Sequence, residues 1–186
     1  MFRRIIAIVF VIGLALLALL TSARSMHGQN LEVSGIGGFG VADGDGYGKS
    51  RVPSGGVALA WPCTSAHKLQ FDYTFGHLER RFIKYNRHFF TGSYVLQARQ
   101  GRNRPFLQIG AGVQYETNNA NEVVGRDFPF NEFRTAFAGV LGAGITVQLG
   151  RSAFMRPQLR TYVAPGATRS GVNVTVLPCA GFGWRF

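Results

Sequence analysis

The C-terminal segment 171–186 alternates between apolar side chains and small or polar ones over its whole length. The apolar set is Val172, Val174, Val176, Pro178, Ala180, Phe182, Trp184 and Phe186. Because successive side chains of a strand point to opposite faces, this period predicts a long β-strand with one apolar face. An exposed strand ending in Phe-x-Trp-x-Phe would promote aggregation in water. The pattern is instead typical of a transmembrane barrel strand, whose apolar face contacts lipid and whose aromatic residues lie at the membrane interface.

Seven further segments show the same alternation and are predicted to be strands: 30–41, 54–61, 67–77, 88–100, 105–116, 131–149 and 153–163. The predicted connections after the second, fourth and sixth strands are short, and the other four are longer. Alternating short turns and long loops are typical of outer-membrane barrels. We therefore predict an all-β fold, an eight-stranded antiparallel up-and-down transmembrane barrel with both termini on the short-turn, periplasmic side.

The first residues have the pattern of a secretory signal peptide. Two arginines precede the sixteen-residue apolar run 5–20, and small residues follow it. This run is shorter than the roughly 20 residues that a membrane-spanning helix needs. We predict a signal peptide at 1–23, with cleavage between Ala23 and Ser25 left open, and a barrel domain at 24–186.

The chain is strongly basic, with 20 Lys and Arg against 9 Asp and Glu. Cleavage after Ala23 would leave 18 against 9, since Arg3 and Arg4 would be lost. A basic protein often binds nucleic acid, but an exported chain without a basic helix or a stacking motif is not expected to do so. The phosphates of lipopolysaccharide are one natural counter-charge. The alternative is that the charges are scattered over solvated surfaces.

The terminal sequence Phe182-Gly183-Trp184-Arg185-Phe186 resembles the last strand of bacterial outer-membrane barrels. Over residues 30–186 the alternating pattern resembles the outer-membrane protein β-barrel domain family, of the type of the OmpA transmembrane domain and OmpX. The resemblance implies location in a Gram-negative outer membrane, contact with its lipid and lipopolysaccharide, and recognition by the barrel assembly machinery. Phe182, Trp184 and Phe186 would form the assembly signal. A peptidoglycan-binding domain is not expected.

The main rival fold is a soluble lipocalin-type barrel, which places its apolar face inward around a ligand. The second face of the predicted strands argues against it, because this face is too rich in Gly, Gln and charge, and too poor in Lys and Glu, for an ordinary solvated exterior. In the transmembrane barrel these polar side chains would instead fill the lumen.

The polar face is predicted to form a lumen network of charged residues. Its members are Glu32, Lys68, Asp72, Arg99, Arg134, Arg156 and Arg160. The lumen of an eight-stranded barrel is so narrow that side chains fill it, and charges removed from water must be paired. The expected role is therefore structural. A narrow anion-conducting pore is the alternative.

A second basic group, Arg80, Arg81, Lys84 and Arg87, falls in the predicted loop 78–87. At the outer leaflet it could bind lipopolysaccharide phosphates by charge-assisted hydrogen bonds. The alternative is an ordinary solvated loop. The expected function is accordingly structural or surface-interacting: envelope integrity, adhesion to an unknown partner or lipopolysaccharide contact.

An enzyme that modifies lipid A, such as a deacylase or acyltransferase, is the competing function. Acyl transfer requires a nucleophile beside its base. The best analogue, His88 with Ser93, would put the two side chains on opposite faces, so no catalytic residue is predicted. No cofactor or metal site is expected either, because the segment 43–50 lacks both a complete phosphate-binding motif and a complete calcium motif. Whether Cys63 and Cys179 form a disulfide stays open.

Overall fold

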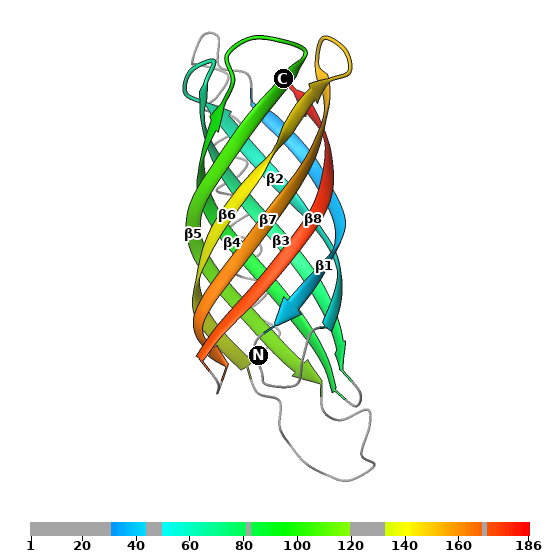
Figure 1. Ribbon diagram of the computed structural model, residues 1–186, viewed down its shortest axis with the longest axis vertical. Coiled ribbons are helices and arrows are strands. Elements are labelled where there is room, and N and C mark those ends of the chain that lie inside the picture. The colour runs from blue at the N-terminus through cyan, green and yellow to red at the C-terminus, as the bar shows by residue number, and fades with distance from the viewer. Residues whose placement is uncertain (1–30, 44–49, 81–82, 120–132, 169–170) are drawn as a thin grey trace, which may run out of the picture.

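The computed structural model describes residues 31–43, 50–80, 83–119, 133–168 and 171–186. Eight antiparallel strands close into one barrel in chain order, and β8 pairs with β1 (Figure 1). The strands are β1 (Glu32–Asp43), β2 (Ser50–Pro62), β3 (His67–Arg80), β4 (Ile83–Gln97), β5 (Asn103–Asn119), β6 (Phe133–Gln148), β7 (Ala153–Thr168) and β8 (Gly171–Arg185). The predicted strand number and antiparallel closure are confirmed. The predicted signal peptide at 1–23 lies outside the described residues.

One end of the barrel, called here the turn end, carries the short connections 63–66, 98–102 and 149–152. The first residues of β1 and the C-terminus also lie there, as Figure 1 shows at the top of the view. Pairing continues to the last residue, because the Phe186 N–H donates to the Leu31 carbonyl at 2.9 Å. The opposite end, called the loop end, carries the other four connections. Among the described residues, no helix is long and apolar enough to cross a membrane.

Two of the expected long loops are largely strand. The loop predicted at 78–87 is wrong, because β3 continues to Arg80 and β4 already begins at Ile83. Likewise β7 continues to Thr168 beyond the predicted end at Val163. The reason for the first extension is visible in Leu78, which keeps the alternation and is fully buried in the barrel.

The strands are staggered by ten residues around the barrel. Following the hydrogen-bonded partners of Glu32 through every strand returns the path to β1 at Ala42. Closure with such a stagger requires tilted strands, and the tilt is visible in Figure 1. It also leaves no open strand edge, which a lipid environment could not satisfy.

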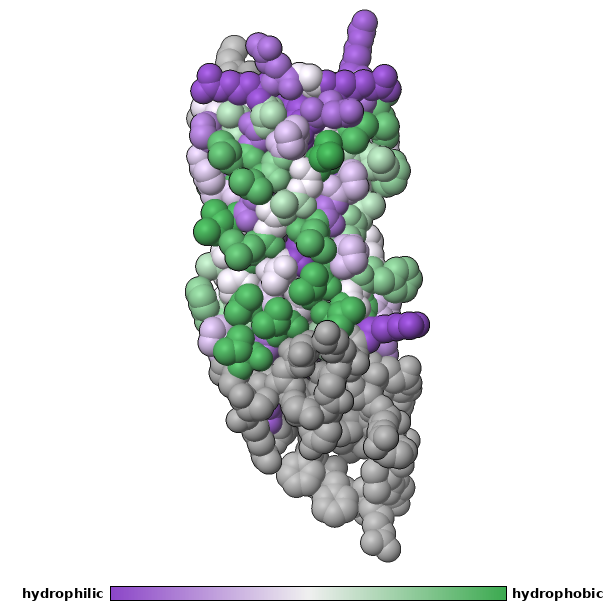
Figure 2. All heavy atoms as spheres, in the orientation of Figure 1, coloured by the Kyte–Doolittle hydropathy of each residue, from purple (hydrophilic) through white to green (hydrophobic). Residues whose placement is uncertain are grey.

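The barrel is apolar outside and largely polar inside. Large apolar side chains such as Phe39, Leu107 and Phe137 are more than 60% exposed on the outer wall. Figure 2 shows such side chains over the middle of the barrel, with a hydrophilic band at the turn end. The interior instead buries glutamines, threonines and charged residues. This orientation is the opposite of the one a soluble lipocalin-type barrel would have.

Gly112 marks a close approach of two strands. A Cβ placed on Gly112 would overlap the Phe90 carbonyl and the Thr91 backbone of β4. We expect Gly112→Val to cost roughly 1–3 kcal/mol in unfolding free energy, as overpacking does, measured by urea unfolding of the refolded barrel. Ala111→Val is the matched control, because Ala111 is exposed on the outer wall. Equal stability of the two variants would contradict the close approach at Gly112.

Candidate functional site in the barrel interior

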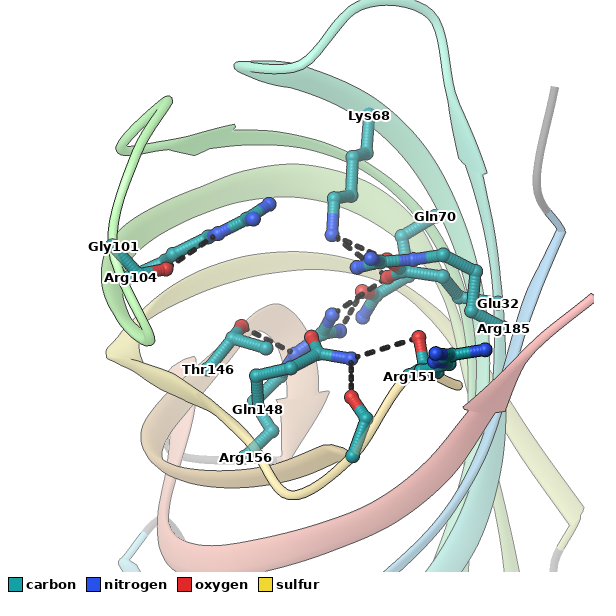
Figure 3. A network of polar contacts seen from close by, with 11 residues as sticks. Glu32, Lys68, Gln70, Gly101, Arg104, Thr146, Gln148, Arg151, Arg156 and Arg185 are labelled. Atoms are coloured by element: carbon teal, nitrogen blue, oxygen red, sulfur yellow. Dashed lines mark hydrogen bonds and ion pairs between the residues drawn. The ribbon is translucent and has the colours of Figure 1, made fainter. Parts of the chain in front are cut away.

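A cluster of ion pairs around Glu32 lies in the lumen at the turn end (Figure 3). Its carboxylate accepts hydrogen bonds from Lys68 Nζ at 2.7 and 2.8 Å, from Arg156 Nη2 at 2.9 Å and from Arg185 Nη2 at 2.7 Å. We call these four residues the Glu32 cluster. Three cations from β3, β7 and β8 share one carboxylate, so Glu32 ties together strands on both sides of β1.

Arg156 is the most enclosed cation of the Glu32 cluster. Its guanidinium lies between the rings of Phe106 and Phe154, 5.2 and 5.1 Å from their centroids. It also donates to Gln70 Oε1 at 2.9 Å and to Thr146 Oγ1 at 3.3 Å. A buried charge is tolerated only when it is paired and hydrogen-bonded, and these contacts meet that requirement.

A second group lies further into the lumen. Asp72 pairs with Arg160 Nη1 at 3.0 Å and accepts hydrogen bonds from Gln70 Nε2 at 2.8 Å and Gln108 Nε2 at 3.1 Å. Gln108 also donates to Ser93 Oγ at 2.9 Å. These five residues form the Asp72 cluster. Gln70 connects it to Arg156 of the Glu32 cluster, so the two groups form one continuous polar network.

An aromatic layer follows the Asp72 cluster toward the loop end. The rings of Phe89 and Tyr162 are stacked with centroids 4.2 Å apart, and both side chains are about 1% exposed. Leu177 and Val140 are buried in the same apolar group. The Tyr162 hydroxyl still bonds Thr74 Oγ1 at 3.1 Å. This layer fills the lumen between two charged regions.

A third polar group lies beyond the aromatic layer. Arg87 Nε pairs with Glu116 at 2.5 Å, and Arg87 Nη1 donates to Asn173 Oδ1 at 3.0 Å and Thr175 Oγ1 at 3.4 Å. We call these residues the Arg87 cluster. Arg87 is two residues from Phe89 along β4, so the aromatic layer separates the Arg87 cluster from the Asp72 cluster.

The lumen residues predicted from the sequence are mostly brought together. Lys68, Arg156 and Glu32 meet in one cluster and Asp72 meets Arg160 in another, as described above. Arg134 is half-buried at the loop end, in register with Glu116. The prediction for Arg99 is wrong: β4 ends at Gln97, so Arg99 lies exposed in the following turn.

The basic group predicted for lipopolysaccharide contact is divided. Arg87 does not face the membrane surface, because it is a buried lumen residue paired with Glu116. Arg80 and Lys84 lie near the tip of the β3–β4 hairpin, where the backbone of Arg80 pairs with Ile83 and that of Lys84 with Glu79. Arg81 lies outside the described residues.

Sequence reasoning missed Glu116 and Arg185 as members of the lumen network. Glu116 continues the alternation of Gln108 and Gln114 along β5, which was a usable signal. Arg185 lies among the aromatics of the C-terminal strand, and nothing in the pattern indicated its contact with Glu32. That contact exists because closure of the barrel places β8 beside β1.

The C-terminal aromatics face outward. Phe182, Trp184 and Phe186 are 55%, 56% and 73% exposed on the outer wall near the turn end. Aromatic side chains at this level are typical of the interfacial girdles of outer-membrane barrels. Their role as an assembly signal stays a prediction.

The histidine-based catalytic alternative is not supported by the geometry. His88 lies on the outer wall, where its Nδ1 is 2.9 Å from the Tyr73 hydroxyl and its ring contacts Phe75 and Tyr115. Ser93 faces the lumen, bonded to Gln108. Base and nucleophile are therefore on opposite sides of the barrel wall.

The sequence left a disulfide between Cys63 and Cys179 open and predicted no metal site. Both cysteines are free: Cys63 is exposed in the β2–β3 turn, and Cys179 is in β8. Among the residues that the structure describes, no three His, Cys, Asp or Glu side chains are grouped so that they could hold a metal ion.

A closed eight-stranded barrel with an apolar wall and a filled, polar lumen defines the class of small outer-membrane β-barrels. Solved structures of this class are similar to the chain. Neisserial surface protein A matches with a TM-score of 0.72 and 13% identity, over 86% of this chain and all of that protein. Ail of Yersinia pestis matches at 0.56 and 15% identity, over 87% of this chain and 100% of that one.

The N-terminal barrel domain of Pseudomonas aeruginosa OprF matches at 0.55 and 16% identity, over 84% of this chain and 97% of that domain. Neither the family models nor the curated proteins match the chain. The predicted resemblance to eight-stranded outer-membrane barrels is thus confirmed for the fold.

The burial of Arg87 leads to a prediction. Arg87→Ala would remove the buried guanidinium that pairs with Glu116, so we expect a loss of about 3–5 kcal/mol in unfolding free energy. Arg51→Ala is the control, because Arg51 is exposed on β2 and its loss should change stability by less than about 0.5 kcal/mol. Urea unfolding of the refolded proteins measures both. Equal effects would show that Arg87 is a surface residue.

Proposed function

We propose that the protein is an outer-membrane barrel with a structural and surface-interaction role and no catalytic activity of its own. It is exported by a cleaved signal peptide, inserted by the barrel assembly machinery and surrounded by lipid and lipopolysaccharide. The single observation that carries the proposal is the filled interior. Three charged clusters and the Phe89–Tyr162 layer fill the lumen. This packing favours a rigid barrel that carries surface loops over a barrel that encloses a ligand.

The narrow-pore alternative conflicts with the aromatic layer. A conducting path would have to pass between the stacked Phe89 and Tyr162 rings and the buried Leu177. Neighbouring charges on either side of this layer are already paired within their own clusters. The interior therefore favours a plug that stabilises the barrel over a selective path.

The enzyme alternative, acting on lipid A, lacks a nucleophile beside a base. His88 and Ser93 are separated by the barrel wall, and the hydrogen-bonding partner of His88 is Tyr73. The proposed surface role depends instead on the loop end, where Arg80, Arg81 and Lys84 remain candidates for lipopolysaccharide contact. An adhesion partner would also bind at this end.

Two measurements test the proposal. Lipid A incubated with the refolded protein should keep all its acyl chains by mass spectrometry, and a gained or lost chain would establish an enzyme.

Lipopolysaccharide binding should weaken when Arg80, Arg81 and Lys84 are replaced together by Gln, with Arg51→Gln as the control. Unchanged binding in the triple variant would remove these residues from the proposed surface role.

A further inference from the structure

The polar wall of the lumen continues to the rim of the turn end. Lys68 of β3, Gln97 of β4 and Arg104 of β5 belong to the lumen-facing rows of their strands. Lys68 pairs with Val95, two residues before Gln97. Gln97 pairs with Phe106, two residues after Arg104. Diagonal neighbours on one face of a sheet are roughly 7–8 Å apart, so Lys68, Gln97 and Arg104 form a continuous strip inside the barrel mouth.

The cations of this mouth exceed the carboxylates that neutralise them. Glu32 already accepts five hydrogen bonds from the three cations of its cluster. A carboxylate offers about four lone-pair sites, so the acceptor capacity of Glu32 is used. In the described part of the chain neither Arg102 nor Arg104 has an acidic partner. The mouth therefore carries an excess of positive charge that an anion from solution can neutralise.

Arg104 extends from β5 into this mouth, and Figure 3 shows its terminal nitrogens pointing away from the β4–β5 turn. Its Nε donates to the Gly101 carbonyl at 3.0 Å, which fixes the direction of the side chain. A hollow of about 290 Å³ at the rim is lined by Arg104, Arg102 and Gln148 together with turn residues. Arg102 Nε donates to the Gln148 carbonyl at 3.2 Å, so a second guanidinium is held at the same rim. The volume is close to the lower limit of ordinary ligand pockets, about 300 Å³, which suits a small anion.

Gln97 is an independent indication of a ligand in the mouth. Its side chain is 3% exposed, yet neither atom of its amide has a hydrogen-bond partner among the described residues. A buried amide that makes no hydrogen bond costs folding free energy. Its place between Lys68 and Arg104 allows Gln97 Nε2 to donate to an anion on this strip.

We propose that the mouth at the turn end binds a small soluble anion that carries a phosphate group. The phosphate lies against the guanidinium groups of Arg102 and Arg104, and Gln97 Nε2 is a further donor. Guanidinium groups bind phosphate through charge-assisted, bidentate hydrogen bonds. The ligand is soluble rather than a membrane lipid, because Arg104 points inside the wall whereas acyl chains contact the outer wall. The inference rests on the outer-membrane location proposed above, which places the turn end in the periplasm.

The test is calorimetric titration of the refolded barrel in a non-ionic detergent with inorganic phosphate and with glycerol 3-phosphate. Ionic strength is held constant, because salt screens exposed charges. Both phosphates should bind, and nitrate should not. Arg102→Gln with Arg104→Gln should weaken binding at least about tenfold, since one charge-assisted hydrogen bond is worth about that factor. Arg51→Gln, which removes an exposed charge at the loop end, should bind both phosphates like the unmodified protein.

A second variant, Gln97→Leu, separates binding from structure. It should weaken phosphate binding roughly two- to tenfold, the range for one neutral hydrogen bond. Without phosphate it should keep or raise the urea midpoint of unfolding, because it removes a buried amide that has no partner among the described residues. A lower midpoint with unchanged phosphate affinity would overturn the site, since Gln97 would then only support the wall.

Equal affinity for phosphate and nitrate would overturn the proposal, because the attraction would then be unspecific. Unchanged affinity in the double arginine variant would also overturn it. Binding of phosphatidic acid in mixed micelles without binding of either soluble phosphate would place the ligand on the outer wall and overturn it as well. Heat-dependent mobility on a detergent gel is recorded for every variant. It reports barrel formation independently, so a failed membrane barrel is distinguished from a folded barrel without phosphate affinity.

Discussion

Replacing Glu32 by Gln is expected to cause one of the largest losses of stability among single substitutions in this barrel. The change removes the one carboxylate that Lys68, Arg156 and Arg185 contact within the described residues, and it leaves three cations close together in the lumen. Breaking a buried ion pair by removing one partner costs about 3–5 kcal/mol, because the remaining charge is buried without compensation. The loss in unfolding free energy is measured by urea unfolding of the refolded protein, with gel mobility as the readout of the folded fraction.

A double variant separates charge from packing in this cluster. Lys68→Met removes one of the three cations, so Glu32→Gln should cost less in the Lys68→Met background, with a coupling of about 0.5–3 kcal/mol. A Glu32→Gln protein within about 0.5 kcal/mol of the unmodified protein would behave like a surface substitution. That result would mean that water in the lumen solvates the three cations in place of the Glu32 carboxylate.

The second large effect is expected from removing the aromatic layer. Phe89→Ala combined with Tyr162→Ala should join the Asp72 and Arg87 clusters through an enlarged lumen. We expect ion flux across liposomes to stay near background for the unmodified barrel and to rise clearly in the double variant. Each truncation of a large buried aromatic also costs about 3–5 kcal/mol, so flux is measured under conditions where the gel shows a folded barrel.

The matched control for this pair is Phe182→Ala. Phe182 is a large aromatic of the outer wall, 55% exposed, so its loss leaves the lumen unchanged. Flux that stays at background in the double variant would show that the aromatic layer is not the barrier. Strong flux through the unmodified protein would favour the narrow pore over the structural role.

Period-two alternation was sufficient to predict the number of strands and which face is apolar. The β5 segment around Leu107, Gln108 and Ile109 illustrates why, since burial follows the alternation residue by residue. Strand ends were less predictable. Polar residues near Arg80 and Ile83 suggested a loop, although a membrane barrel can continue its hairpins beyond the lipid with polar strands.

The lumen contacts were only partly predictable because they depend on the stagger of the closed barrel. Alternation places Glu32 and Arg156 in the interior, but only the ten-residue stagger decides that they meet. Arg87 was misplaced for another reason: the predicted fourth strand began at His88, whereas β4 begins at Ile83 and pairs Arg87 with Glu116 of β5. Arg99 was misplaced for a simpler reason, since the predicted fourth strand was three residues too long.

The location of the positive charge also could not be predicted from composition. The excess of Lys and Arg suggested phosphates of lipopolysaccharide as the counter-charge. The three short turns, the four strand residues on either side of each and the adjoining ends of β1 and β8 carry seven basic side chains and one acidic one, Glu32. The sequence segments 43–51, 79–87, 116–134 and 165–172 carry nine basic and seven acidic residues. The positive excess is therefore greater at the turn end, where Lys68, Arg156 and Arg185 share Glu32 in the lumen.

The orientation of side chains across the barrel wall is tested most directly by spin labels on one strand. Cys63 and Cys179 are first replaced by Ser, and single labels are then placed at positions 107, 108 and 109 of β5 in lipid bilayers. We predict high access to oxygen, which partitions into lipid, and low access to a water-soluble nickel chelate at 107 and 109. Position 108 should show low access to oxygen because Gln108 is 3% exposed in the lumen. High oxygen access at 108 with low access at 107 and 109, or equal access at all three positions, would contradict the apolar-out barrel.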